Sequence, residues 1–253
     1  MLRAGLVSIT FRQLPPDEVV AWAVQAGLDG IEWGGDIHVP HGDLAAGKRV
    51  GALTRDAGLA VAAYGSYYRC GPEQPELFAA VLTTAEALGA DLIRVWAGRQ
   101  GSDQATPDSR AAVAADLRRV VDLAAEAGVR ITTEWHGGTL TDTAQAAREL
   151  FAAVDRPGLR TYWQPRTRQA PEVNDSELAV ALPRLGGVHV FQWDAASGAR
   201  EALAGGAADW PGWLRRLAAA TDGYALLEFV RDDDPQQMVR DAATLRAWLA
   251  EIP

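Results

Sequence analysis

Two glutamates that each directly follow an apolar run are the residues of this sequence best suited to chemistry. Glu134 has no arginine or lysine within three residues in sequence, and the nearest to Glu228 is Arg231. A carboxylate at such a position must be ionised and paired, bound to a metal, or kept protonated by desolvation. An ion pair with Arg94 or Arg231 is the purely structural alternative. We predict that Glu134 and Glu228 are catalytic and face each other across a substrate, where they could transfer protons, hold a divalent cation, or do both.

Other polar and aromatic side chains end apolar runs in the same way. The expected substrate-binding residues are Glu32, Trp33, Tyr64, Arg94, Trp96, His136, Trp163, Gln192 and Trp193. Tryptophan is unusually frequent, with 9 residues against 5 phenylalanines, and five of these rings fall at run ends: Trp33, Trp96, Trp135, Trp163 and Trp193. Because flat rings stack on sugars and planar groups, we predict that at least three of the five border a central pocket. The alternative is that they pack beneath outer helices. Gln164 and His189 are further candidates to position substrate oxygens.

A repeated pattern of a glycine followed by an apolar run places these residues in a fold. The repeat has a spacing of roughly 30 to 40 residues, which is the size of a βα unit. Its glycines are Gly27, Gly58, Gly89, Gly128, Gly158, Gly187 and Gly223. Glycine is expected there because helices often end in a left-handed residue. Helices are expected between the runs, among them 16–26, 107–127, 141–154, 211–219 and 235–249, and an opening strand at 2–9.

Eight short apolar strands, each followed by a helix, predict a single (β/α)8 TIM barrel over residues 1–253. An open, doubly wound sheet is the competing architecture. It normally has a glycine-rich phosphate loop after its first strand, whereas residues 8–14 contain no glycine. Since chemistry in a barrel lies at the carboxyl ends of the strands, Glu32, Glu134, Gln164 and Glu228 should share that rim.

Composition narrows the choice of partners. The chain of 253 residues has a formal net charge of -9, which disfavours nucleic acid, and its single cysteine cannot form an internal disulfide. No apolar run reaches the ~18 residues that a membrane span needs, and the first residues lack the apolar core of a signal peptide. We expect a cytoplasmic protein whose partner is a small-molecule substrate, with no membrane or nucleic-acid partner. A homodimer is compatible with the sequence.

Five short motifs follow one another in order along the chain. They are GLDGIE at 27–32, IRVWAG at 93–98, TEWH at 133–136, GGAADW at 205–210 and LEF at 227–229. Together they resemble the xylose-isomerase-like barrel superfamily, the sugar phosphate isomerase and epimerase group that also contains endonuclease IV-type enzymes. The resemblance covers nearly the whole chain.

The resemblance implies one divalent metal ion, Mn²⁺ or Mg²⁺, held by Glu134, Gln164, His189 and Glu228. In the family, the four ligands are a glutamate, an aspartate, a histidine and a glutamate on strands five to eight, and the two glutamates move the protons in epimerases. This sequence departs at two positions. Gln164 replaces the aspartate, and Phe191 stands at the position most used by the histidine, with His189 one pleat away. An amide in place of a carboxylate removes a full charge and should weaken a site for a hard cation.

The function expected from these residues and this resemblance is an isomerase or epimerase of a small sugar, polyol or related hydroxy-carbonyl compound. Glu134 and Glu228 would exchange a proton beside a carbonyl, while Arg94, Gln164 and His189 position the oxygens. A lyase or dehydratase could use the same pair to expel a hydroxyl group. A non-catalytic binding barrel with a degraded metal site is the other alternative. A repair endonuclease is disfavoured because its metals need more histidine and aspartate ligands, and because the chain is acidic.

Overall fold

Eight parallel strands close into a barrel in the computed structural model, which describes residues 1–252. The strands are β1 (Arg3–Val7), β2 (Gly30–Gly34), β3 (Ala60–Arg69), β4 (Leu92–Trp96), β5 (Arg130–Glu134), β6 (Arg160–Trp163), β7 (Leu185–Val190) and β8 (Tyr224–Leu227). Each strand pairs with the next, and β8 pairs with β1 so that Arg3 lies opposite Tyr224 and Leu6 opposite Leu227. The predicted (β/α)8 barrel is therefore confirmed, and the open sheet is excluded.

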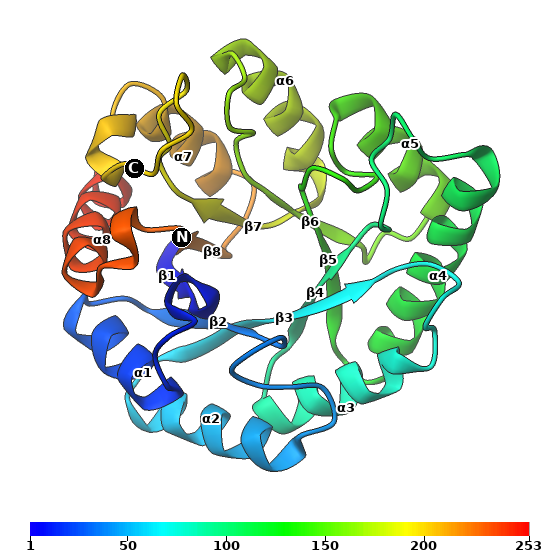
Figure 1. Ribbon diagram of the computed structural model, residues 1–253, viewed down its shortest axis with the longest axis horizontal. Coiled ribbons are helices and arrows are strands. Elements are labelled where there is room, and N and C mark those ends of the chain that lie inside the picture. The colour runs from blue at the N-terminus through cyan, green and yellow to red at the C-terminus, as the bar shows by residue number, and fades with distance from the viewer. Residues whose placement is uncertain (253) are drawn as a thin grey trace.

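Eight α-helices form a ring around the strands (Figure 1). The helices are α1 (Pro16–Gln25), α2 (Leu44–Asp56), α3 (Leu77–Leu88), α4 (Pro107–Glu126), α5 (Ala144–Val154), α6 (Pro171–Ala181), α7 (Trp210–Ala218) and α8 (Pro235–Ala250). The largest difference from the sequence-based bounds is at α5, which was expected to start at residue 141. It starts later because Thr143 is its cap and accepts a hydrogen bond from the Ala146 N–H at 3.2 Å. None of the helices within residues 1–252 is long and apolar enough to cross a membrane.

The glycine repeat marks where the chain leaves a helix, although glycine is not the cap in every unit. Gly89 ends α3 in the left-handed region, with φ at 81°. After α5, however, Asp155 takes the left-handed conformation, with φ at 48°, and Gly158 lies three residues further on. Aspartate tolerates this region better than most residues do, so the repeat predicts the period better than it predicts the caps.

Two apolar layers leave room for a polar site at one end of the barrel. The larger layer lies between the strands and the helices. The smaller one consists of Val7, Ile9, Ala62, Ala63, Leu92, Tyr162, Tyr224 and Leu226. Because side chains alternate across a strand, Tyr224 and Leu226 on β8 share one face, and Glu228 continues that face beyond the strand end. The same alternation brings charged residues to the carboxyl ends of several strands.

Candidate active site

Five charged side chains meet where the strands end, and we call them the mouth cluster. They are Glu32 on β2, Arg94 on β4, Glu134 at the end of β5, His189 on β7 and Glu228 just after β8. Their exposed fractions lie between 0% and 4%. Ionised groups so far from water are stable only when opposite charges or hydrogen bonds compensate them. The contacts within the cluster therefore decide which groups carry charge.

Arg94 links two of the carboxylates. Its Nε donates to Glu32 Oε1 at 2.7 Å and its Nη1 donates to Glu134 Oε2. Burial alone would raise the pKa of Glu32 and of Glu134, but the charge of Arg94 and the contacts with His189 lower both below their usual range. Gly65 makes room for the guanidinium, because a Cβ there would lie 2.8 Å from both Arg94 Nη2 and Glu32 Oε1. The ion pair with Arg94, which the sequence offered as an alternative to a catalytic role, is therefore present for Glu134.

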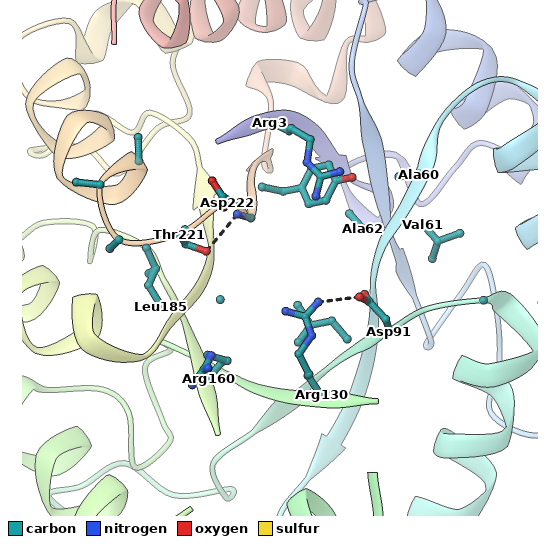
Figure 2. A pocket seen from close by; sticks show the side chains of 18 of the residues that line it. Arg3, Ala60, Val61, Ala62, Asp91, Arg130, Arg160, Leu185, Thr221 and Asp222 are labelled. Carbon is teal, nitrogen blue, oxygen red and sulfur yellow. Dashed lines mark hydrogen bonds and ion pairs between the residues drawn. The ribbon is translucent and has the colours of Figure 1, made fainter. Parts of the chain in front are cut away.

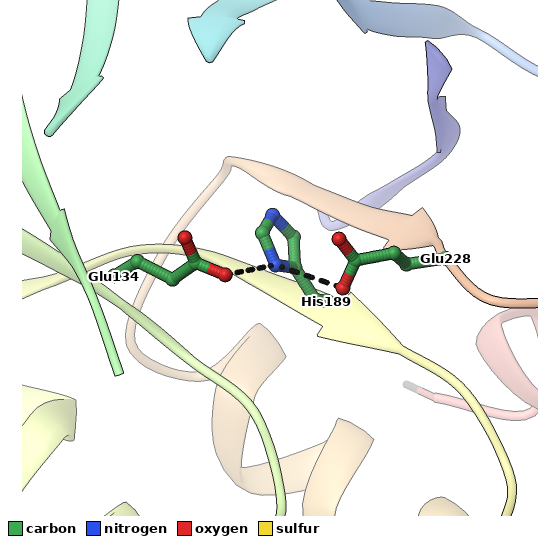
Figure 3. A group of neighbouring side chains, drawn as sticks. All are labelled: Glu134, His189 and Glu228. Atoms are coloured by element: carbon green, nitrogen blue, oxygen red, sulfur yellow. Dashed lines mark ion pairs between the residues drawn. The ribbon is translucent and has the colours of Figure 1, made fainter. Parts of the chain in front are cut away.

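His189 lies between the two predicted catalytic glutamates (Figure 3). Its Nδ1 is 3.5 Å from Glu134 Oε1 and 3.4 Å from Glu228 Oε2, and it makes a 2.9 Å hydrogen bond with Gln164 Oε1. Its Nε2 faces Glu32 Oε2 at 3.7 Å. Burial disfavours a charged imidazole, but the carboxylates of Glu228, Glu134 and Glu32 outweigh this effect and raise the pKa of His189 to about 10. The predicted rim of Glu32, Glu134, Gln164 and Glu228 is assembled around this imidazole.

Glu228 has no arginine partner in the cluster. Burial raises the pKa of Glu228 to about 7, with His189 opposing the rise and Glu134 adding to it. Its Oε2 is buried and lacks a hydrogen-bond partner. The two carboxylates that flank His189 therefore differ in how readily they hold a proton, since the pKa of Glu134 is lowered and that of Glu228 is raised. Such a pair matches one general base with one general acid.

Trp96 holds Glu134 rather than offering a free stacking surface. The indole Nε1 donates to Glu134 Oε2 at 2.6 Å. The ring is stacked on His136, with centroids 4.3 Å apart, and the Arg69 guanidinium lies 3.7 Å from the ring centroid. Two predicted substrate-binding residues, Trp96 and His136, thus form a support beside the mouth cluster. Together with Arg94, Trp96 occupies one oxygen of Glu134 and leaves Oε1 directed at His189.

The mouth cluster suits a divalent cation by both its donor atoms and its charge. One ligand atom from each of Glu134, His189 and Glu228 lies within 4.8 Å of the others. His189 Nε2, Glu228 Oε2 and Glu32 Oε2 are buried without hydrogen-bond partners. When His189 is neutral and the three carboxylates are ionised, they carry two more negative charges than Arg94 balances. One divalent ion would neutralise this excess. Carboxylate oxygens and an imidazole are ligands for Mg²⁺ or Mn²⁺. Three of the four ligands implied by the resemblance, Glu134, His189 and Glu228, thus lie together, and the fourth, Gln164, is hydrogen-bonded to His189.

His189 supplies the imidazole that the resemblance would have placed at residue 191. Phe191 instead packs edge-on against Trp193 and Phe229, at centroid distances of 6.0 and 5.9 Å. The two positions lie on the same side of the chain because they are two residues apart. His189 is the deeper of the two, and its depth is what brings it to Glu134 and Glu228.

The expectation that three or more of the five tryptophans border the central pocket is wrong. Trp33, Trp135 and Trp163 are buried on the outer side of the barrel, beneath the helices. The Trp33 indole donates to Thr54 on α2, the Trp135 indole donates to Glu177 on α6, and Trp163 packs on the indoles of α7. Each directly neighbours an inward-facing residue in sequence, so the alternation of strand side chains turns it outward.

Tyr64 also points away from the mouth, and its hydroxyl donates to the Val39 carbonyl oxygen at 2.8 Å. Gln192 and Trp193 lie nearer the mouth and line a cavity of about 150 Å³ between the loops that follow β6 and β7. Trp193 packs against Phe229 with centroids 5.6 Å apart. Of the predicted substrate-binding set, Gln192 and Trp193 are therefore at the rim, Glu32 and Arg94 are inside, and Trp33, Tyr64 and Trp163 are outside.

Tyr67 is a residue of the mouth that the sequence analysis missed. Its ring centroid lies 5.1 Å from Arg94 Cζ, and its hydroxyl accepts a 2.9 Å hydrogen bond from Arg12. Burial raises the pKa of Tyr67 to about 12, so the phenol stays protonated. The expected strand ended at Tyr64, whereas β3 continues to Arg69 with an irregular register against β4. No apolar run marks this extension.

The chain belongs to the xylose isomerase-like TIM barrel family, whose sequence model matches residues 20–251. The resemblance seen in the motifs is thereby confirmed. Comparison with curated protein sequences gives no significant match.

Solved structures of the same barrel cover this chain almost completely. The probable 3-DHS dehydratase AsbF, involved in petrobactin synthesis in Bacillus anthracis, has a TM-score of 0.80 at 19% identity, with 97% of this chain and 99% of that chain covered. A xylose isomerase-like TIM barrel protein from Mycobacterium smegmatis, in complex with magnesium, has a TM-score of 0.78 at 16% identity and covers 100% and 98%. The 3-keto-D-glucoside 4-epimerase YcjR from E. coli has a TM-score of 0.71 at 20% identity and covers 99% of each chain. At these identities the likeness shows the fold.

Proposed function

We propose that this protein is an isomerase or epimerase that moves a proton at the carbon beside a carbonyl group of a small sugar, polyol or related hydroxy-carbonyl compound. The observation that carries the proposal is the placement of Glu134 and Glu228 on either side of His189, with one carboxylate oxygen of each 3.5 and 3.4 Å from its Nδ1. Their oxygens lie close enough for one small group to contact both. Epimerases among the structural neighbours support the same reaction class.

The two glutamates divide the work by charge. Ionised Glu134 takes the proton from the carbon, and the electron pair of the broken C–H bond moves into the carbonyl to give an enediolate. Protonated Glu228 then delivers its proton to the carbon, which restores the carbonyl and leaves Glu228 ionised. The reverse reaction exchanges these roles. When a divalent ion is held by Glu134, His189 and Glu228, it supplies polarisation of the carbonyl oxygen.

The remaining residues of the mouth position and shield the reacting groups. Arg94 and Trp96 hold Glu134 Oε2, so that only Oε1 is free to act. Gln164 fixes the ring of His189 through Nδ1. Tyr67 covers Arg94 from the side of the β3 extension. Groups fixed in this way need little reorganisation during the reaction.

We further propose that the substrate is uncharged. Arg94 and a bound divalent ion together only balance the three carboxylates of the mouth cluster, so the cluster offers an anion no net attraction. Of the arginines beyond it, Arg166 is paired with the buried Glu177 carboxylate at 2.7 Å. An unphosphorylated compound fits these surroundings better than a sugar phosphate.

Hydrogen exchange at carbon tests the proposal directly. The protein, loaded with Mn²⁺ or Mg²⁺, is incubated in D₂O with neutral ketoses, aldoses and keto-glycosides, and the carbon-bound deuterium is followed by NMR. We expect deuterium beside the carbonyl in at least one compound, together with its epimer or isomer, and no formation of that epimer or isomer with Glu134→Gln or Glu228→Gln. Binding of these compounds without any exchange would contradict the proposal and favour a binding barrel.

A dehydratase is the second candidate, because the fold of AsbF is also shared and a protonated Glu228 suits it. Glu134 would again take a proton from carbon, but Glu228 would protonate a departing hydroxyl group. The same incubation separates the two reactions in mass spectrometry, since dehydration gives a product that has lost one water, whereas an epimer keeps all its atoms and gains only the mass of the exchanged deuterium.

A further inference from the structure

A second charged cavity lies at the opposite end of the barrel, where the strands begin. Its volume is about 910 Å³. Arg3, Arg130 and Arg160 are the first residues of β1, β5 and β6, and Arg55 comes from the last turn of α2. Figure 2 shows the side chains of Arg3, Arg130 and Arg160 around this space. The cavity is separated from the mouth cluster by the apolar interior of the barrel, which includes Tyr224 and Leu92.

The cavity carries an excess of positive charge in a chain whose formal net charge is -9. Two carboxylates line it: Asp91 pairs with Arg130 at 2.8 Å, and Asp222 contacts the amino group of Met1. The amino group and Arg3 both lower the pKa of Asp222. Among residues 1–252, no carboxylate lies within ion-pair distance of the other three arginines, Arg3, Arg55 and Arg160. Three guanidinium groups around one hollow are therefore not compensated by direct contact with a carboxylate.

A structural role accounts for only part of this arrangement. Arg55 donates to the Leu88 carbonyl oxygen at 3.1 Å, and Arg160 donates to the Pro157 carbonyl oxygen at 2.8 Å. A guanidinium has five N–H groups, so both keep unused donors. The Arg3 guanidinium has no hydrogen bond within the described residues and lies 4.0 Å from the centroid of the Tyr224 ring. That contact orients Arg3 without using its N–H groups.

Small residues keep the hollow open between the arginines. Ala60, Ala62, Gly186 and Gly223 stand at the strand starts that line it. At Gly186 a Cβ would lie 3.1 Å from the Cβ of Arg160, and at Gly223 it would lie 2.5 Å from the Gly186 carbonyl oxygen. The resulting volume is in the range of sites that take whole metabolites.

We propose that this cavity is a second ligand site that binds a multivalent anion, a molecule with two or more phosphate or carboxylate groups. More than one anionic group is required because the three guanidinium groups without a carboxylate contact come from separate elements: β1, α2 and β6. Guanidinium groups match both phosphate and carboxylate oxygens through paired N–H donors. The Asp91–Arg130 pair is more than half exposed on both sides, so it is weak and a ligand can compete for Arg130. This site is independent of the function proposed for the mouth.

Calorimetric titration of the full chain with pyrophosphate and with citrate tests the proposal. The protein is first treated with EDTA and dialysed, because both anions chelate divalent ions. We expect one-to-one binding of at least one anion, which weakens as NaCl is raised. The double variant Arg3→Gln/Arg160→Gln should weaken binding by about tenfold or more, since it removes two charge-assisted contacts.

The matched control is Arg49→Gln/Arg148→Gln, which makes the same change in charge at exposed positions outside the cavity. It should leave the affinity within about twofold, because distant surface charges are screened. Glu134→Gln should also leave it unchanged, since the anion binds far from the mouth. Thermal unfolding of each variant checks that it folds. The proposal is overturned if neither anion binds at millimolar concentration, if both double variants lose affinity equally, or if Glu134→Gln changes it.

Discussion

The two ends of the barrel hold their charges in opposite ways. At the mouth, three carboxylates surround Arg94 and His189, and every one of these groups is nearly excluded from water. At the other end, four arginines line an open cavity with two aspartates, and Arg55 and Arg160 each donate to a backbone carbonyl oxygen. Charges that depend on one another are sensitive to a single change, whereas charges that face solvent are not. The comparison predicts where substitutions should be severe.

Removing Arg94 should have the largest effect. Arg94→Met leaves Glu32 and Glu134 buried without their cation, and we expect a loss of about 3–5 kcal/mol in the free energy of unfolding. Urea denaturation measures this loss. Arg99→Gln is the control, since it breaks the exposed contact with Glu73, and should cost at most about 1 kcal/mol. Equal losses in the two variants would remove the distinction between a buried and an exposed ion pair.

Replacing either glutamate beside His189 should affect turnover more than stability. Glu134→Gln and Glu228→Gln each keep the shape of the side chain but abolish proton transfer, so kcat should fall by about a hundredfold or more. Arg3→Gln, at the other end, should leave kcat unchanged. Steady-state kinetics on a substrate found by deuterium exchange provides the measurement. Full activity in either glutamine variant would end the proposed mechanism.

The stability of the metal-free protein should fall as pH rises. His189 has a pKa raised to about 10 from an ordinary value of 6.5, so its contribution is complete below pH 6.5 and is lost as pH rises through about 10. The pKa of Glu228 is raised from 4.5 to about 7, so its contribution to stability is complete below pH 4.5 and is lost as the pH rises through about 7. We expect a decrease on the order of 2 kcal/mol across pH 6.5–10 in EDTA. His189→Asn should flatten that part of the curve, and an unchanged slope would show that His189 does not hold the extra proton.

The smallest effect is expected at Trp96. Trp96→Phe keeps a ring against His136 but removes the N–H that donates to Glu134, which is worth about 1 kcal/mol. We expect a roughly fivefold lower kcat with little change in KM, and an acidic limb of the pH profile moved to higher pH because Glu134 loses a donor. A purely structural role would lower the thermal stability and leave that limb in place.

The polar residues of the mouth were predictable because chemistry and periodicity agree there. Glu32, Glu134, Gln164 and Glu228 each end a strand on the inward side, and the glycine repeat was enough to count the strands. The tryptophans were assigned to the wrong face of the barrel because the prediction considered only that they end apolar runs. It did not consider which side of the strand each side chain faces. Trp33 and Trp135 directly follow inward glutamates, so alternation alone assigns them to the outer face. This correction needed no structure.

Other parts of the mouth could not be derived from the sequence. Tyr67 reaches Arg94 because β3 continues past Tyr64 with an irregular register, and Tyr67 itself is left-handed, with φ at 56°. Such a conformation is uncommon for a tyrosine, and tertiary contacts impose it. The depth of His189 relative to Phe191 likewise depends on the register of β7 against β6, which shifts between Thr161 and Tyr162. A register shift between neighbouring strands cannot be predicted from the types of residue in them.

The outward tryptophans give the fold an optical signature. Trp163 on β6 meets Trp210 and Trp213 on α7, and the three rings lie edge to face with centroids 5.3 to 6.2 Å apart. Indole transitions this close couple as excitons and split into circular dichroism bands of opposite sign. Trp210 and Trp213 couple within α7 itself, whereas the two couplings of Trp163 exist only while α7 is seated on the barrel wall. The part of the couplet that Trp163→Phe removes therefore reports the docking of one helix, separately from any event at the mouth.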